Sequence, residues 1–235
     1  MLAGHQRLLS ALCVVLAVGA GGVGCSKEKS DTKAEEGKSS QSQTSKAPGS
    51  TQASVTAAPG LKPTLDDYIK QDNITQENLK PGVEGAPDIK IPTVPGWGDA
   101  GAKTPEYAYG ALFATDPAYG MDPPRMVIVL SKLTGEVDKA KVLQYAPNEV
   151  FNLPQFSGGN AGRPVNLAGF DAVEAGGTFV RNGQTRVIAQ KSVVIPGKDA
   201  LYVLTFNAEA PKDLAGVLSK ETTAIDAEVK ITAPQ

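Results

Sequence analysis

The side chains best suited to nucleophilic or metal chemistry are confined to the start of this chain. Its two cysteines are Cys13 and Cys25, and its single histidine is His5. Imidazole and thiolate groups are the bases, nucleophiles and zinc ligands of most hydrolases and metalloenzymes. Residues 26–235 therefore offer no Ser-His-Asp triad, no Cys-His pair and no zinc site of the usual kind. We expect no metal, no cofactor and no disulfide there.

Cys25 directly follows a segment that is typical of secretory signals. His5 and Arg7 form a weakly basic start, residues 8–20 are uncharged and mostly apolar, and residues 21–24 are small. A transmembrane helix needs about 20 consecutive apolar residues, and this run is shorter. The pattern therefore predicts a signal peptide over residues 1–24 that is removed from the mature protein.

A cysteine at this junction resembles the bacterial lipobox, in which the thiol receives a diacylglyceryl group and a peptidase cuts before it. Val23 and Gly24 fit that signal, whereas Gly22 replaces its usual leucine. Each buried CH₂ of an acyl chain contributes about 0.8 kcal/mol, so two or three chains on Cys25 would anchor the protein stably. We expect a lipid-anchored protein on the outer face of the cytoplasmic membrane, in the cell envelope. An ordinary signal peptide with a chance cysteine is the alternative.

The chain after Cys25 divides into a polar linker and a domain. Residues 25–62 hold hardly any large apolar side chain, which is typical of a disordered segment with a root-mean-square span of roughly 30–35 Å. Residues 63–235 are long enough for a single globular domain. That domain has 16 Lys and Arg against 21 Asp and Glu, a formal charge of −5. The acidic balance argues against nucleic-acid binding.

Five aromatic side chains are candidate contacts for a ligand or a partner. Tyr107, Tyr109 and Phe113 have odd spacing along a predicted strand, which puts them on one face of it. They could line a groove for an acyl chain or a sugar, or they could face the core under a helix. Trp97 and Tyr119 lie beside glycines in predicted loops, where sugar stacking or a partner contact competes with ordinary packing.

Carboxylates are the remaining candidates for catalysis. Asp66 and Asp67 are adjacent, and Glu106 and Asp116 flank the aromatic strand. A glycosidase needs two carboxyl groups about 5–10 Å apart across a cleft. Asp66 and Asp67 also fit the first turn of a helix, where acidic side chains complement the helix dipole without any catalytic role.

The elements that must position these side chains follow from periodicity and turn residues. Thr64 and Asp67 form a capping-box pattern, Pro147 predicts a break in a helix, and Asn182-Gly183 predicts a hairpin turn. The predicted helices cover residues 64–70, 138–151 and 211–222, and the predicted strands cover residues 88–91, 107–115, 126–133, 170–181, 184–195, 200–207 and 225–231. Antiparallel strands with separate helices predict an α+β domain, a twisted sheet with helices on its faces.

Four segments resemble one known family. They are DDYIKQDNI (66–74), IPTVPGW (91–97), VIVLSKLTGEVDKAKVLQYAPNEVFNLPQF (127–156) and AQKSVVIP (189–196). Together they resemble the LpqN/LpqT family of actinobacterial, mycobacterial-type lipoproteins from about Thr64 to Thr232. The resemblance implies a Mog1/PsbP-like α/β/α sandwich around a twisted, mainly antiparallel sheet. It brings no binding motif that can be placed residue by residue.

The same resemblance implies a role in the mycolate envelope. Family members are linked to MmpL-type lipid exporters and secreted mycolyltransferases, and binding of trehalose-type glycolipids has been proposed for them. We therefore expect a non-enzymatic lipoprotein that acts as an accessory or carrier in glycolipid transport. A protein-binding scaffold without a lipid pocket and a carboxylate-based hydrolase or transferase are the alternatives.

Overall fold

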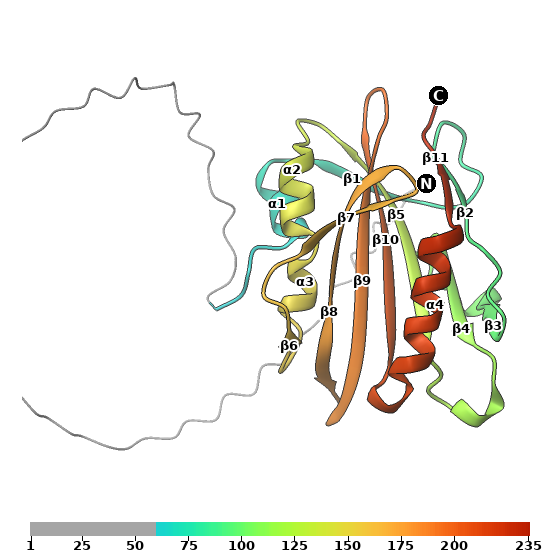
Figure 1. Ribbon diagram of the computed structural model, residues 1–235. Helices are drawn as coiled ribbons and strands as arrows, with labels where there is room; N and C mark the ends of the chain where they lie inside the picture. Colours follow the sequence, from blue (N-terminus) through green and yellow to red (C-terminus); the bar gives the residue numbers. More distant parts are fainter. Residues whose placement is uncertain (1–59) are drawn as a thin grey trace, which may run out of the picture. The chain divides into compact units, whose positions relative to one another are not determined.

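The computed structural model describes residues 60–235. The predictions for the signal peptide, for the linker up to residue 59 and for Cys25 lie outside that range. Within it, the chain forms the expected α+β fold around one large antiparallel sheet (Figure 1). From residue 60 onward, no helix is both long enough and apolar enough to cross a membrane.

The large sheet has the strand order β3-β4-β5-β10-β9-β8-β6, with β1 paired to β5 and β7 paired to β8. Its strands are β1 (Thr75–Leu79), β3 (Trp97–Asp99), β4 (Gly110–Ala114), β5 (Arg125–Thr134), β6 (Ser157–Gly158), β7 (Arg163–Leu167), β8 (Phe170–Arg181), β9 (Gln184–Pro196) and β10 (Leu201–Pro211). A two-stranded sheet joins β2 (Asp88–Lys90) to β11 (Lys230–Thr232). The helices are α1 (Leu65–Gln71), α2 (Lys139–Tyr145), α3 (Asn148–Phe151) and α4 (Ala215–Glu228), with 3₁₀ turns η1 (Gly101–Lys103), η2 (Pro117–Tyr119) and η3 (Lys212–Leu214).

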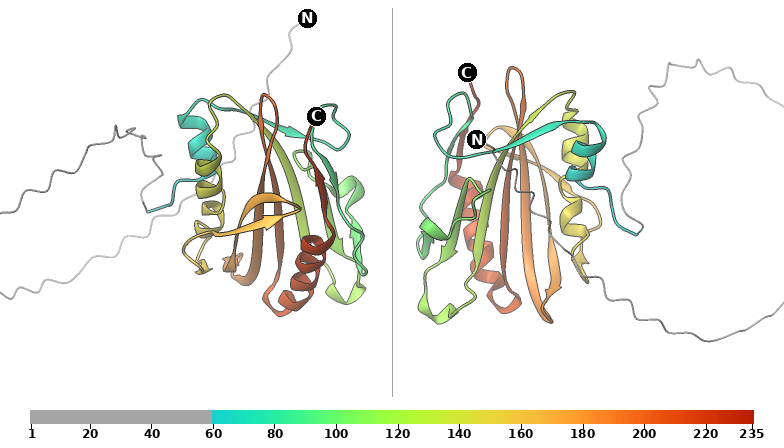
Figure 2. Two further views of the ribbon diagram at one scale, coloured as in Figure 1. Left: turned by 45° about the horizontal axis from the view of Figure 1, so that its top comes forward. Right: turned by 180° about the vertical axis from the view of Figure 1, so that it is seen from behind.

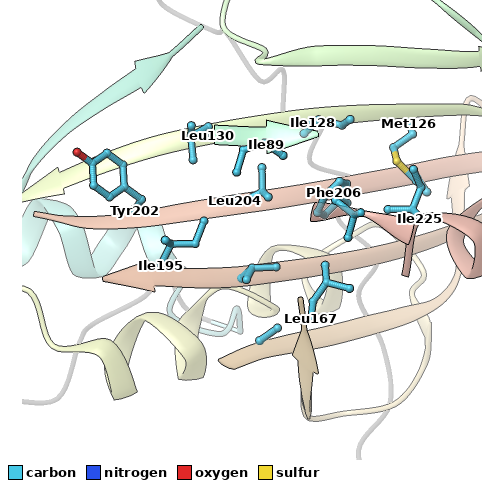
Figure 3. Packing of buried hydrophobic residues seen from close by; sticks show 14 of the residues in the cluster. Ile89, Met126, Ile128, Leu130, Leu167, Ile195, Tyr202, Leu204, Phe206 and Ile225 are labelled. Atoms are coloured by element: carbon cyan, nitrogen blue, oxygen red, sulfur yellow. The ribbon is translucent and has the colours of Figure 1, made fainter. Parts of the chain in front are cut away.

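The two faces of the sheet are covered by different helices, which gives the α/β/α arrangement. Side chains alternate along β9, so Val193 and Ile195 pack in one cluster while Val194 packs in another. The first cluster lies under α4, through Leu218 and Ile225, and Figure 3 shows its large side chains between the strands. The second cluster joins α1 and α2 to the opposite face, which Figure 2 shows from behind.

Local signals place the first three helices as expected. The Thr64 hydroxyl accepts from the backbone N–H of Asp67 at 3.2 Å, and the Asp67 carboxylate accepts from the Thr64 backbone at 2.8 Å. These hydrogen bonds from Thr64 lower the pKa of Asp67, so Asp67 is a capping carboxylate. Asp66 is exposed and pairs with Lys70 at 3.9 Å. The break predicted at Pro147 separates α2 from α3.

Two of the predicted strands differ from those observed, and four observed strands were not predicted. The strand expected over 107–115 begins only at Gly110, because a turn closed by the Ala108 N–H and the Pro105 carbonyl precedes it. The strand expected from Ile225 is the end of α4, and β11 starts at Lys230, because Leu218 and Ile225 are spaced for one helix face. The strands β1, β3, β6 and β7 were not predicted at all, and Trp97, which was expected in a loop, begins β3 because it pairs with Ala114 of β4.

A groove on the open half of the sheet

Opposite α4, the sheet carries a groove of about 860 Å³. It lies on the part of the face that α1 and α2 leave uncovered, and Figure 2 shows these helices gathered at one side of that face. Its floor is formed by β4, β5, β8, β9 and β10. Its walls are the segments around η1 and η2 on one side and α3 on the other. Apolar side chains in its lining include Pro105, Tyr107, Ala111, Phe113, Met121, Pro123, Val127, Val150, Leu153 and Ile188. The volume is in the range of pockets that hold small-molecule ligands.

Cross-strand register sets the order of side chains on the floor. One row runs from Phe113 on β4 through Arg125 on β5 and Glu209 on β10 to Ile188 on β9. Directly paired residues of antiparallel strands project to the same face. This row therefore places apolar side chains at its ends and charged side chains between them.

Polar side chains form a nearly buried column along the middle of this face. Gln190 donates to Asn207 at 3.0 Å, and the hydroxyls of Ser192 and Thr205 lie 3.1 Å apart. These residues alternate along β9 and β10 with the apolar residues that face α4. Buried polar groups are tolerated where they are hydrogen-bonded, and these pairs lie across adjacent strands. The column continues into the groove, where Gln190 and Asn207 form part of the lining.

Charged side chains form a cluster around Glu209, at one end of the polar column. The Glu209 carboxylate accepts from Arg181 Nη1 at 2.6 and 2.7 Å, from Arg125 Nη2 at 3.4 Å and from Arg186 Nε. Arg186 also donates to Asp122 through Nη1 at 2.5 Å and Nη2 at 3.0 Å. This bond lowers the pKa of Asp122 and raises that of Arg186.

The wall formed by α3 also holds the start of the domain. The backbone N–H of Lys62 donates to the Asn152 side chain at 2.9 Å, and that side chain donates back to the Lys62 carbonyl at 2.8 Å. Asn148 donates to the Pro63 carbonyl at 2.6 Å. The Lys62 ammonium lies 4.5 Å from the centre of the Phe151 ring. These bonds fix residues 62–63 beside the groove wall.

The five aromatic candidates divide between the two sides of the sheet. Tyr107, which is 55% exposed, and Phe113 line the groove. Tyr119 lines a neighbouring pocket of about 500 Å³ that shares Asp122 with the groove. Trp97 and Tyr109 pack against the core on the α4 side.

The expectation that Tyr107, Tyr109 and Phe113 share one strand face is therefore wrong. Tyr107 and Tyr109 precede β4, so the alternation of the strand does not apply to them. Burial raises the pKa of Tyr109, and a hydrogen bond with the Ile89 backbone opposes that rise.

Sequence reasoning missed the charged residues of the floor. Arg186 and Glu209 are 4% and 7% exposed, although they lie in strands that are otherwise rich in apolar residues. Glu209 is 84 positions from Arg125 and 28 from Arg181, so only the strand register brings them together. The sequence held one available signal for these residues, which is a charged residue within a strand that is otherwise rich in apolar residues.

Another buried carboxylate lies on the far side of the sheet. Glu221 of α4 is 0% exposed, and neither of its oxygens has a hydrogen-bond partner within residues 60–235. Burial raises its pKa to about 7. No group of three or more His, Cys, Asp or Glu side chains suited to hold a metal ion occurs in that range.

Comparison with known proteins identifies the family. The family model described as probable lipoprotein LpqN matches residues 61–232. Lipoprotein LpqN of Mycobacterium tuberculosis is 41% identical over 178 residues, which are 74% of this chain and 76% of the relative. The solved structure of LpqN "involved in cell envelope biogenesis of Mycobacterium tuberculosis" has a TM-score of 0.69 and covers 72% of this chain and 97% of its own. The homologous domain thus folds as a separate unit, and this chain belongs to the LpqN family of lipoproteins.

Proposed function

We propose that the protein is a membrane-tethered, non-enzymatic carrier or accessory protein that holds an amphiphilic lipid in the groove. The lipid class is a glycolipid of the trehalose or mycolate type, and the process is its transport or its use in envelope biogenesis. The observation that supports this proposal is the composition of the groove. A hydrogen-bonded polar column lies directly beside apolar walls in a space of about 860 Å³.

The apolar wall provides a place for an acyl chain. Val150 and Leu153 line the groove on the α3 side, and Phe113 and Ile188 add apolar side chains at the two ends of one floor row. Burial of apolar surface contributes about 25 cal/mol per Å², so the affinity for an acyl chain increases with the length of chain that contacts these side chains. The unused amide groups of Gln190 and Asn207 offer donors and acceptors to hydroxyl groups of a sugar.

The tether belongs to the same proposal. Acylation at Cys25 would hold the domain near the outer face of the cytoplasmic membrane. A flexible linker raises the effective concentration of the domain near membrane partners. We propose an MmpL-type exporter as the donor of the lipid and a secreted mycolyltransferase as a partner that receives it.

A hydrolase or transferase built on carboxylates is less well supported. Glu209 is the buried carboxylate of the groove, and its oxygens are engaged by three arginines. Asp116 and Glu149 also line the groove but are exposed at its border. Partial loss of hydration, and secondarily the charge of Asp66, raises the pKa of Glu149 even though its side chain keeps exposed surface.

A protein-binding role is favoured by one separate observation. Met121 is fully exposed at the rim of the groove, and Tyr107 is half-exposed near it. Exposed methionine and aromatic side chains are enriched at protein interfaces. Capture of a protein partner that is lost in Met121→Asp and kept in Phe113→Ala would favour this function, because Met121 is at the exposed rim whereas Phe113 is on the floor.

Native mass spectrometry of the domain, residues 61–235, tests the carrier function directly. We expect a one-to-one complex with a trehalose glycolipid that bears a long acyl chain. Phe113→Ala removes an apolar side chain of the groove floor and should weaken binding roughly tenfold, since burial of such a side chain contributes about 1.5–3 kcal/mol. Val83→Ala, an exposed apolar residue outside the groove lining, is the matched control. No complex at high micromolar lipid concentration contradicts the proposal.

A further inference from the structure

We propose that Arg125 and Arg181 form a subsite for a phosphate or carboxylate group on the groove floor, so that the groove selects amphiphiles with an anionic head. This inference rests on the lipid-carrying function proposed above and narrows the lipid class to amphiphiles whose head carries an anionic group.

The charges of the cluster do not cancel. Arg125, Arg181 and Arg186 bring three positive charges, and Glu209 and Asp122 bring two negative charges. Arg186 is buried and uses all three of its nitrogens on the two carboxylates. The cluster keeps a formal charge of +1, which is shared by the two arginines that reach the groove.

These two arginines have donors to spare. Arg125 uses only Nη2 and Arg181 only Nη1 in bonding to Glu209. Within residues 60–235, the Nε and the second Nη of each have no acceptor. Their side chains are 48% and 42% exposed, and both line the groove. A guanidinium with free N–H groups binds phosphate or carboxylate through paired hydrogen bonds.

The geometry allows one anion to contact both guanidinium groups. Each has a nitrogen within 3.4 Å of the same Glu209 carboxylate, so the two groups are neighbours on the floor. Arg181 is further held in place by Phe179, whose ring centre lies 5.1 Å from the guanidinium carbon. A site whose donors are already held loses less side-chain entropy on binding.

The arginines produce a positive electrostatic potential at this end of the groove. The pKa of Asp122 is lowered mainly by its hydrogen bonds from Arg186, and the charges of Arg125 and Arg181 lower it further. The carboxylates of Asp116 and Glu149 also line the groove, but they come from the bordering segments rather than from the floor strands. The anionic head would lie on the floor and the alkyl chain along the apolar wall.

Isothermal titration calorimetry with two probes tests the subsite. Dodecyl phosphate and dodecyl maltoside, both below their micelle concentrations, share an alkyl chain and differ in the head. We expect the domain, residues 61–235, to bind dodecyl phosphate at least tenfold more tightly. The double variant R125Q/R181Q should lose that preference and keep its affinity for dodecyl maltoside, which also shows that it is folded. R163Q removes an exposed arginine that pairs with Glu174 outside the groove, and it should keep the preference.

Two further arms separate the sources of the anion. If inorganic phosphate displaces dodecyl phosphate at equal concentration, the ligand is free phosphate. If displacement needs a large excess of inorganic phosphate, the ligand is a lipid head group. Equal affinity for the two detergents, or a preference that survives R125Q/R181Q, overturns the subsite and leaves the carrier function standing. Failure of both detergents to bind overturns the carrier function as well.

Discussion

The backbone N–H of Asp138 donates a hydrogen bond to the hydroxyl oxygen of Tyr68 at 2.8 Å. Tyr68 is completely buried in α1, and Asp138 is the N-cap of α2. The Tyr68 ring also lies 5.8 Å from the ring of Tyr145, between centroids. One side chain thus fixes the start of α2 and packs against its end, which joins α1 to α2 on the face of the sheet opposite α4.

Tyr68→Phe should lower the free energy of unfolding by about 1–2 kcal/mol. It removes one hydrogen bond and leaves the Asp138 N–H without its partner, while the ring packing is kept. Urea unfolding followed by circular dichroism measures the change. Tyr107→Phe, in which the hydroxyl belongs to an exposed residue, should change stability by less than about 0.5 kcal/mol. Equal effects of the two substitutions would show that the hydrogen bond does not matter.

The unpartnered Glu221 predicts a stability that falls as the pH rises. Its pKa is raised from an ordinary 4.5 to about 7. Between these values the folded protein keeps a proton that the unfolded chain releases. The free energy of unfolding therefore decreases by up to roughly 1.4 kcal/mol per pH unit, and the loss is complete above about pH 7. Carboxylates with lowered pKa values, such as Asp67 and Asp122, change the free energy of unfolding only at pH values below this range.

Urea unfolding at pH 5, 6, 7 and 8 tests this prediction, and Glu221→Gln should reduce the decline because it removes one titrating group, while Glu149, whose pKa is also raised, remains. Glu136→Gln, at an exposed position, is the control and should leave the slope unchanged. A wild-type profile without any decline between pH 5 and 7 would refute the assignment.

Two glycines should respond oppositely to alanine. A Cβ at Gly177 would lie 2.5 Å from the Ser157 carbonyl and 2.8 Å from the Phe156 ring, so Gly177→Ala should displace β6 from β8. We expect a loss of about 1–3 kcal/mol, as for other overpacked sites. A Cβ at Gly216 in the first turn of α4 meets nothing within 4 Å, and Gly216→Ala should be neutral or stabilise by up to about 1 kcal/mol. Thermal unfolding of both variants checks the contrast.

Lipidation at Cys25 is tested by mass spectrometry of the protein from cells. Cys25→Ser should accumulate as an uncut precursor without acyl chains, because the thiol is the acceptor in the proposed processing. Cys13→Ser lies inside the predicted signal and should be processed normally. A normally cleaved Cys25→Ser protein would support an ordinary signal peptide instead.

Local signals in the sequence were sufficient for most elements. The turn at Asn182-Gly183, with φ values of 52° and 75°, joins β8 to β9 as predicted. The Thr64–Asp67 capping box and the break at Pro147 were also confirmed. Each of these features depends on residues within a few positions of one another, so no tertiary information is needed to read it.

The groove could not be predicted from local sequence signals. The strand β1 is polar along four of its five residues because it lies at the exposed edge of the sheet, so it has no apolar alternation to detect. Phe113 could be proposed for the groove from its strand, but Arg125 and Glu209 meet only through the pairing of β5 with β10. The pairing of strands that are distant in sequence decides which charged residues lie together on the groove floor. A local sequence pattern contains no information about that pairing.

The attachment of Lys62 to Asn152 has a mechanical consequence. Asn152 immediately precedes Leu153 of the groove wall, and Asn148 holds the neighbouring Pro63. Any tension along the chain between an anchored Cys25 and the domain reaches the fold at these hydrogen bonds before it reaches the sheet. A load on the tether would thus pull first on α3, and the width of the groove would respond to force while the β5-β10-β9 centre stays intact.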